Sequence, residues 1–279
     1  MQLTVIVTAQ YDGTTIKEYL SEQGYSTTQI KRFKYSGEIS VNGEPVTVRR
    51  ILKEGDVLTL ATEERLSTPE IAACPAEIVY ADKYLYVAKK QYGVAIHPDR
   101  THKTDTFGNM LAASFGTNFQ LRIITRLDKT TSGLVLGALD EVTAEKLNSL
   151  QQSHGITKIY SALVEGIVQD DNGEIDLPLA RIDSENKTVV DFDNGKPSKT
   201  RYGVRKINKN TTLLTVTPLT GRTHQIRAHI AAIGHPIVGD TLYGAMPAER
   251  IMLHCERLIF IHPYTGERID VDSPADFSL

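Results

Sequence analysis

Hydrophobic and polar positions divide the chain into two parts, and the first part contains short elements. Helical spacing follows Thr15, and a second helix is predicted from Ser26 to the glycine at position 37. Asn42-Gly43 lies between alternating apolar residues and predicts a tight hairpin, because both residues accept positive φ. A further strand is predicted over residues 57–60. The apolar helical positions are Ile16, Tyr19 and Leu20 in the first helix and Ile30 and Phe33 in the second.

From residue 76 onward the predicted elements are longer and of both kinds. Helices are predicted to begin at the N-caps Asp105 and Asp140, and another covers residues 226–233 before Gly234 and Pro236 end it. Strands and helices mix without a regular β-α-β alternation, so the predicted fold class is α+β rather than a doubly wound sheet. Strands are predicted over residues 78–80, 84–88, 158–164 and 213–216, hairpins and loops over 166–197, and a final hairpin over 258–271.

A polar segment that contains Pro69 separates the two parts. We expect a small domain over residues 1–66, a linker over 67–75 and a larger domain over 76–279. The length of 279 residues suits one small and one large domain.

The composition indicates a soluble cytoplasmic protein. Hydrophobic residues make up 41% of the chain and charged residues 23%, and the formal net charge is −3, as in an ordinary globular protein. The two cysteines, Cys74 and Cys255, form no C-x-x-C pair, which argues against a cysteine zinc site and a disulfide framework. No apolar run approaches the ~20 residues of a membrane helix and no signal peptide is evident, so we expect no membrane association.

Cations are in excess within the first domain. Between residues 27 and 53, six cations stand against two carboxylates, a local charge of +4 in a chain whose total is −3. Charge alone favours an ordinary solvated surface. However, the order of helix, basic helix, glycine, Asn-Gly turn and Gly-Asp-Val strand over residues 13–60 resembles the alpha-L RNA-binding fold of bacterial small-subunit ribosomal proteins, which implies an RNA-binding module. The cations are Lys31, Arg32, Lys34, Arg49, Arg50 and Lys53.

The candidate chemistry centres on the run Arg126-Leu127-Asp128-Lys129, which a Thr-Thr-Ser-Gly turn joins to an apolar strand. A carboxylate between two cations stays ionised, which suits a nucleophile or an anionic catalyst. By itself, an Arg-Leu-Asp triplet is typical of a surface ion pair. The small residues that follow it favour instead the close approach of another segment.

Two further segments carry chemistry. Strand alternation places Tyr160, in Lys-x-Tyr, either in the core or against a nucleobase. Arg222, His224 and Arg227 crowd the start of a helix, where the helix dipole and the cations together favour anions. From this segment alone, Arg227 is interpreted equally well as a solvated cation or as the partner of a partly buried carboxylate. The five-residue spacing from His224 to His229 does not suit zinc, so we expect no metal site.

Four motifs occur in a characteristic order along the chain: Arg-Leu-Asp-x-x-Thr-Ser-Gly, Lys-x-Tyr, Gly-Arg-Thr-His-Gln-Ile-Arg-x-His and Ile-Gly-x-Pro-Ile-x-Gly-Asp-x-x-Tyr-Gly. Together they resemble, over residues 78–263, the RluA family of pseudouridine synthases. The resemblance implies a catalytic domain with a mixed, largely antiparallel sheet and flanking helices. It also implies that uridine in RNA is detached at its glycosidic bond, rotated and rejoined through C5, without a cofactor or metal. From its residues alone, the turn over 239–244 is interpreted as scaffold.

The resemblance assigns roles to individual residues. Asp128 matches the essential aspartate, Tyr160 the tyrosine that packs on the uracil, Arg227 the arginine that pairs with the aspartate, and Arg126 the arginine that replaces the flipped base. Tyr160 is also one candidate for helping to remove the C5 proton. We expect large-subunit ribosomal RNA as the substrate, transfer RNA as the second choice, and a monomer with no nucleotide cofactor. Further RNA contacts are expected at Arg222, His224 and the basic residues of the first domain.

The chain departs from the family pattern at two positions. Thr125 stands where the family usually has histidine, and Gln91 stands where it often has the proline of Lys-Pro-x-Gly, which predicts a looser loop near the cleft. Two alternatives stay open at this point. One is a non-catalytic RNA-binding or ribosome-assembly factor; the other is a hydrolase with Asp128 as nucleophile, which would need a general base that no motif supplies.

Overall fold

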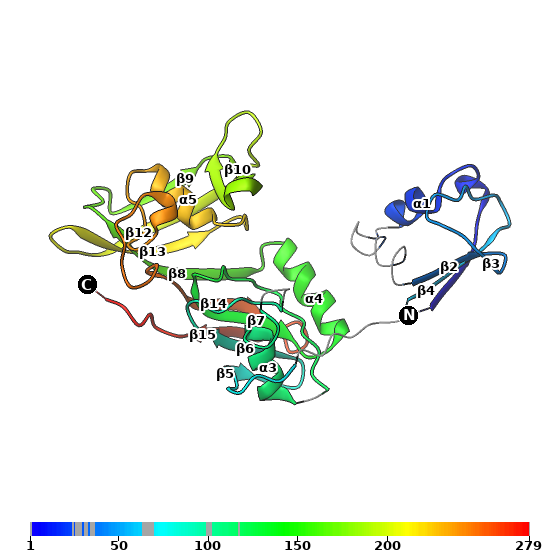
Figure 1. Cartoon of the computed structure of the whole chain (residues 1–279), viewed down its shortest axis with the longest axis horizontal. Coiled ribbons are helices and arrows are strands. Elements are labelled where there is room, and N and C mark those ends of the chain that lie inside the picture. The colour runs from blue at the N-terminus through cyan, green and yellow to red at the C-terminus, as the bar shows by residue number, and fades with distance from the viewer. Residues whose placement is uncertain are drawn as a thin grey trace. The chain divides into compact units, whose positions relative to one another are not determined.

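The chain forms two compact units, residues 1–66 and 67–279, each with its own hydrophobic core (Figure 1). The structure, a computed structural model, describes residues 2–23, 25, 30, 33, 37–62, 70–98, 102–116 and 118–278.

The N-terminal unit is a four-stranded antiparallel sheet with strand order β1-β4-β2-β3. Helix α1, Ile16–Glu22, begins at a capping box, in which Thr15 and Glu18 each accept a backbone N–H of the other. The predicted hairpin is confirmed, with φ of 55° at Asn42 and 84° at Gly43. The second predicted helix falls largely outside the described residues. The other elements are β1 (Gln2–Ile6), η1 (Ala9–Tyr11), β2 (Gly37–Val41), β3 (Glu44–Pro45) and β4 (Val57–Thr62).

The second unit is built on a nine-stranded sheet, as far as the described residues show. Its order is β5-β6-β7-β14-β8-β13-β12-β9, with β15 paired to β14, and β7 and β14 run parallel while the other pairs are antiparallel. The α+β class with a mixed, largely antiparallel sheet is therefore confirmed. The strands are β5 (Glu77–Ala81), β6 (Leu85–Lys90), β7 (Ser132–Ala138), β8 (Ile156–Glu165), β9 (Asn172–Asp176), β12 (Lys199–Ile207), β13 (Thr211–Pro218), β14 (Leu253–Ile261) and β15 (Arg268–Asp272); β10 (Leu179–Ile182) and β11 (Lys187–Val190) form a separate hairpin.

Three α-helices flank this sheet in the described part of the unit: α3 (Phe107–Phe115), α4 (Glu141–Gln152) and α5 (Gln225–Ala232). Asp140 caps α4 as predicted, because its carboxylate accepts the backbone N–H of Thr143. The predicted cap Asp105 is wrong by one residue: Thr106 caps α3 through a capping box with Asn109. Short 3₁₀ helices cover Asp183–Glu185 (η2) and Thr241–Tyr243 (η3). No helix among the described residues is long and apolar enough to cross a membrane.

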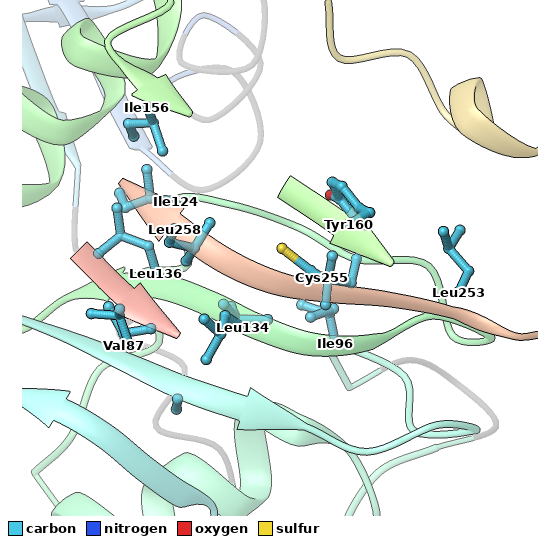
Figure 2. Packing of buried hydrophobic residues seen from close by; sticks show 14 of the residues in the cluster. Val87, Ile96, Ile124, Leu134, Leu136, Ile156, Tyr160, Leu253, Cys255 and Leu258 are labelled. Carbon is cyan, nitrogen blue, oxygen red and sulfur yellow. The ribbon is translucent and has the colours of Figure 1, made fainter. Parts of the chain in front are cut away.

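The central strands β7, β14 and β8 bring their buried residues together in the core of this unit (Figure 2). All seven residues of β7 are buried, as expected for a strand covered on both faces. On β8, Tyr160 pairs with Cys255 of β14, and both side chains belong to the buried cluster. The loop that carries Asp128 leads directly into β7, so the rigid centre of the sheet holds the candidate catalytic segment in place.

Gly133, the second residue of β7, is required by its close approach to β14. Its φ is +119°, and a β-carbon there would lie 2.3 Å from the carbonyl oxygen of Cys255. We expect Gly133→Ala to lower the free energy of unfolding by about 1–3 kcal/mol, because the backbone of β14 must shift. Urea denaturation measures this, with Gly203→Ala as control, since a β-carbon at Gly203 comes no closer than 3.9 Å to any neighbour. Equal stability of the two variants would contradict the packing described here.

Candidate active site

A cleft of about 400 Å³ opens in the second unit. Its walls come from the loop before β7, the end of α4, strand β8 and the loop that leads into α5. Segments that are distant in the chain therefore meet around one space of a size that suits a small ligand or a single nucleotide base. The residues it gathers include six that the sequence motifs single out: Arg126, Asp128, Tyr160, Arg222, His224 and Arg227.

Asp128 lies in the cleft with 29% of its side chain exposed. Its backbone oxygen accepts the N–H of Thr131 in the tight turn that precedes β7. The imidazole of His224 faces this carboxylate, with its Nε2 3.9 Å from Oδ2. Thr125, which stands in place of the family's histidine, is buried, and its hydroxyl accepts the N–H of Leu136. Thr125 therefore anchors the Asp128 loop to β7 rather than facing RNA.

Lys90 holds the other side of the Asp128 loop. It is fully buried at the end of β6, and its ammonium donates to the backbone oxygens of Gln91, Val94 and Lys129 at 2.9, 2.9 and 3.3 Å. Gly93 also donates its N–H to the Lys129 oxygen. The loop that lacks the family's proline is thus tied to the residue that follows Asp128. Burial lowers the pKa of Lys90 to about 7, although the charge of Asp128 acts in the opposite direction.

Replacement of Lys90 by methionine gives a pH-dependent prediction. The unfolded lysine keeps its proton up to about pH 10, whereas the folded amine loses it near pH 7. The unfolded state therefore binds more protons in this window, so the Lys90 contribution to stability rises as pH increases from 7. We expect the difference in unfolding free energy, wild type minus Lys90→Met, to increase between pH 7 and about 9. Urea denaturation at several pH values measures this difference. Lys209→Met, at an exposed lysine, is the control and should give a difference that does not change with pH. A difference for Lys90→Met that does not change with pH would contradict the prediction.

Tyr160 projects from β8 into the wall of the cleft and is buried beside Leu253 and Cys255 of β14 (Figure 2). Burial, with smaller contributions from Cys255 and the charge of Asp128, raises the pKa of Tyr160 well above its usual value. Its hydroxyl therefore stays protonated at neutral pH. The expected help of Tyr160 in removing the C5 proton stays a prediction, as does the stacking of its ring on a base.

Arg227 does not form the predicted ion pair with Asp128. Its guanidinium instead makes a bidentate pair with Asp240, donating from Nε to Oδ2 at 2.6 Å and from a terminal nitrogen to Oδ1 at 2.7 Å. Both side chains are almost fully buried, and Arg227 also lies 5.0 Å from the centroid of the Tyr243 ring. The physical reason is that η3 brings a buried carboxylate against α5, where a planar guanidinium fits it closely.

The charge of Asp128 nevertheless acts on Arg227 through space. Burial by itself lowers the pKa of Arg227, but hydrogen bonds and charge from Asp240, and then the charge of Asp128, outweigh it and raise the pKa. Asp240 was interpreted from the sequence as scaffold. The sequence places Asp240 in a Gly-Asp turn near Tyr243, and this motif was the only sign that the residue could have a role in the site. Nothing in the motif indicates that the partner of Asp240 is Arg227.

The loop into α5 is fixed by Gln225. Its amide oxygen accepts from Thr220 Oγ1 and Arg222 N, and its amide nitrogen donates to Lys199 O and Thr200 Oγ1. His224 stands at the helix start with a φ of +53°. Arg222 is exposed at the rim of the cleft, as is Arg126. The result is a rigid wall with two cations presented to solvent.

The basic residues predicted in the first domain lie in the other unit. Arg49 and Arg50 are exposed. Lys31, Arg32 and Lys34 lie outside the described residues. A cluster of three or more histidine, cysteine, aspartate or glutamate side chains able to hold a metal ion is not found in the described ranges of the chain.

Comparison with known proteins gives consistent matches. A sequence model of the RNA pseudouridylate synthase family matches residues 84–232, a span that contains all six cleft residues predicted from the motifs. The chain is 36% identical over 269 residues to a Bacillus subtilis (strain 168) protein described as the uncharacterized RNA pseudouridine synthase YjbO, covering 93% of this chain and 95% of that one. It is 31% identical over 299 residues to ribosomal large subunit pseudouridine synthase C of Escherichia coli (strain K12), covering 99% and 93%. A solved structure of human RNA pseudouridylate synthase domain containing 1 is similar with a TM-score of 0.63 and 30% identity, covering 73% of this chain and 84% of that one.

Proposed function

The chain belongs to the RNA pseudouridylate synthase family, and from this premise we propose that its cleft isomerises specific uridines of large-subunit ribosomal RNA, with Asp128 as the catalytic carboxylate. The enzyme class follows from the family. The substrate and the residue roles are our proposal. One observation carries it: a half-buried aspartate and a buried tyrosine share a cleft of about 400 Å³.

The proposed reaction begins with base flipping. A uridine stacked in paired RNA cannot expose its glycosidic bond, so it is turned out of the helix, which costs a few kcal/mol. Stacking on the Tyr160 ring offsets about 1–3 kcal/mol of that cost. Arg126, exposed at the rim, fills the space that the base leaves and contacts the RNA backbone.

Asp128 then acts at the ribose C1′ of the flipped nucleotide. The turn before β7 and the bonds from Lys90 and Gly93 to Lys129 orient its loop. The Arg227–Asp240 pair forms a fixed wall rather than a mobile partner of Asp128. This preorganisation lets the carboxylate meet C1′ without rearranging the cleft.

Ribosomal RNA is proposed as the substrate because the Escherichia coli relative is named for the large ribosomal subunit. Exposed Arg49 and Arg50 in the N-terminal unit support additional phosphate contacts.

Tritium release tests the proposal. Large-subunit ribosomal RNA labelled with tritium at uridine C5 is incubated with the protein, since rejoining through C5 expels that hydrogen. We expect release equivalent to one or a few uridines per RNA. Transfer RNA from the same cell is the parallel substrate. Release from transfer RNA alone would contradict the ribosomal assignment, and no release from either would contradict the proposed function.

A further inference from the structure

Lys158 is a cation in the cleft without a described partner. It lies two residues before Tyr160 on β8, so both side chains leave the same face of the strand, roughly 7 Å apart along it. Lys158 lines the cleft together with Asp128 and is half-buried. Within the described ranges, its amine makes no hydrogen bond or ion pair. A half-buried amine without a partner, at the edge of a stacking platform, is placed to receive a ligand.

The other charged residues of the cleft are paired, exposed or negative, unlike Lys158. Arg227 is neutralised by its bidentate pair with Asp240. Arg126 and Arg222 are exposed at the rim, where RNA phosphates compete for them. Burial lowers the pKa values of His97 and His224, which favours the neutral form of both imidazoles. Asp128 adds a negative charge.

Glycosidic cleavage in this cleft needs a compensating positive charge. An oxygen of Asp128 supplies an electron pair to C1′ as the C1′–N1 bond breaks. The electron pair of the broken bond leaves with N1 and spreads onto the uracil oxygens O2 and O4. The resulting uracil anion would lie beside the Asp128 loop, in a partly dry site where electrostatic interactions are strong.

We propose, on the basis of the function proposed above, that the Lys158 ammonium donates a hydrogen bond to a carbonyl oxygen of the flipped uracil and stabilises the negative charge formed as the glycosidic bond breaks. This makes Lys158 a catalytic residue that acts on the leaving group, while Asp128 acts on the ribose. The spacing of Lys-x-Tyr then has a physical reason: the tyrosine supports the face of the base and the lysine reaches its edge.

The local environment supports such a donor. Burial lowers the pKa of Lys158, and the neighbouring Cys255 acts in the opposite direction. An ammonium that holds its proton less tightly is a stronger hydrogen-bond donor to a developing anion. The binding of an anionic base would also relieve the cost of leaving this cation half-buried and unpaired.

The test compares two leaving groups in Lys158→Met. A large-subunit RNA fragment that the wild type modifies is prepared with uridine or 5-fluorouridine at the target position, since fluorine withdraws electrons and stabilises the uracil anion by itself. Loss of the N-glycosidic nucleoside is followed in single turnover with enzyme in excess. We expect the variant to slow uridine about 10²–10³-fold and 5-fluorouridine at least ~10-fold less. Lys209→Met, at an exposed turn, should leave both rates and their ratio unchanged.

Equal losses on the two substrates would overturn the assignment, because a lysine needed only for folding or phosphate binding slows both alike. If thermal unfolding shows that Lys158→Met does not fold, Lys158→Leu, which also removes the donor, carries the same comparison. If the wild type is active and the variant keeps the wild-type ratio of the uridine and 5-fluorouridine rates, the role of Lys158 is overturned but the proposed function is not. If the wild type modifies no uridine in any large-subunit RNA fragment, so that no such substrate can be prepared, the proposed function itself is overturned.

Discussion

Asp128→Asn is expected to lower the rate of pseudouridine formation by about 10⁴-fold or more, as for other residues that act directly on the reacting bond. The amide has nearly the shape of the carboxylate, so the turn to Thr131 and the bonds to Lys129 should survive. The variant loses the negative charge and the nucleophilic oxygen that C1′ requires. Tritium release from labelled RNA measures the rate, and gel-shift titration measures RNA binding, which should change less than threefold.

A matched substitution separates this effect from a general loss of charge. Asp170 is exposed in the loop after β8 and does not line the cleft. Asp170→Asn removes the same charge with the same change of shape, and should keep the wild-type rate. Measurable turnover by Asp128→Asn, within tenfold of the Asp170→Asn rate, would remove Asp128 from the mechanism.

The second large effect is expected at the buried pair of Arg227 and Asp240. Asp240→Asn leaves the Arg227 guanidinium buried without its hydrogen-bonded counter-charge, which should lower the free energy of unfolding by about 3–5 kcal/mol. Asp240 is fully buried and Arg227 nearly so, so water cannot replace the lost charge. Urea denaturation at pH 7 measures the change. Replacement of both residues by apolar side chains should cost less than Asp240→Asn alone.

An exposed pair of the same type provides the control. Arg257 and Asp270 are also bidentate, but Arg257 is 44% exposed. Asp270→Asn should therefore lower stability by less than about 1 kcal/mol. If Asp240→Asn were no more destabilising than Asp270→Asn, burial would not be what makes the Arg227 pair important.

Local rules were sufficient for much of the fold. Asn42-Gly43 predicted its hairpin because few residues accept positive φ, and Asp140 predicted a helix start because its carboxylate can accept a free N–H. Where two polar residues competed, as at Asp105 and Thr106, the sequence could not tell which side chain would cap α3. The ordered motifs also predicted the cleft residues, since all six line one space.

The pairing inside the cleft could not be predicted in the same way. The partner of Arg227 depends on how the turn over 239–244 packs against α5, which is a property of the tertiary structure rather than of either segment. The burial of Lys90 could not be predicted either, because a lysine at the end of a strand normally reaches solvent. Lys158 did have a sequence signal: strand alternation places it on the face of Tyr160, although alternation does not show that its amine lacks a partner.

A pseudouridine map of large-subunit ribosomal RNA tests the central claim most directly. The map is made from a strain that lacks this protein, and from the same strain supplied with either the wild type or Asp128→Asn. Our account predicts that one or a few pseudouridines disappear in the deletion strain, return with the wild type and stay absent with the variant. A map that does not change on deletion, or that Asp128→Asn restores, would contradict it.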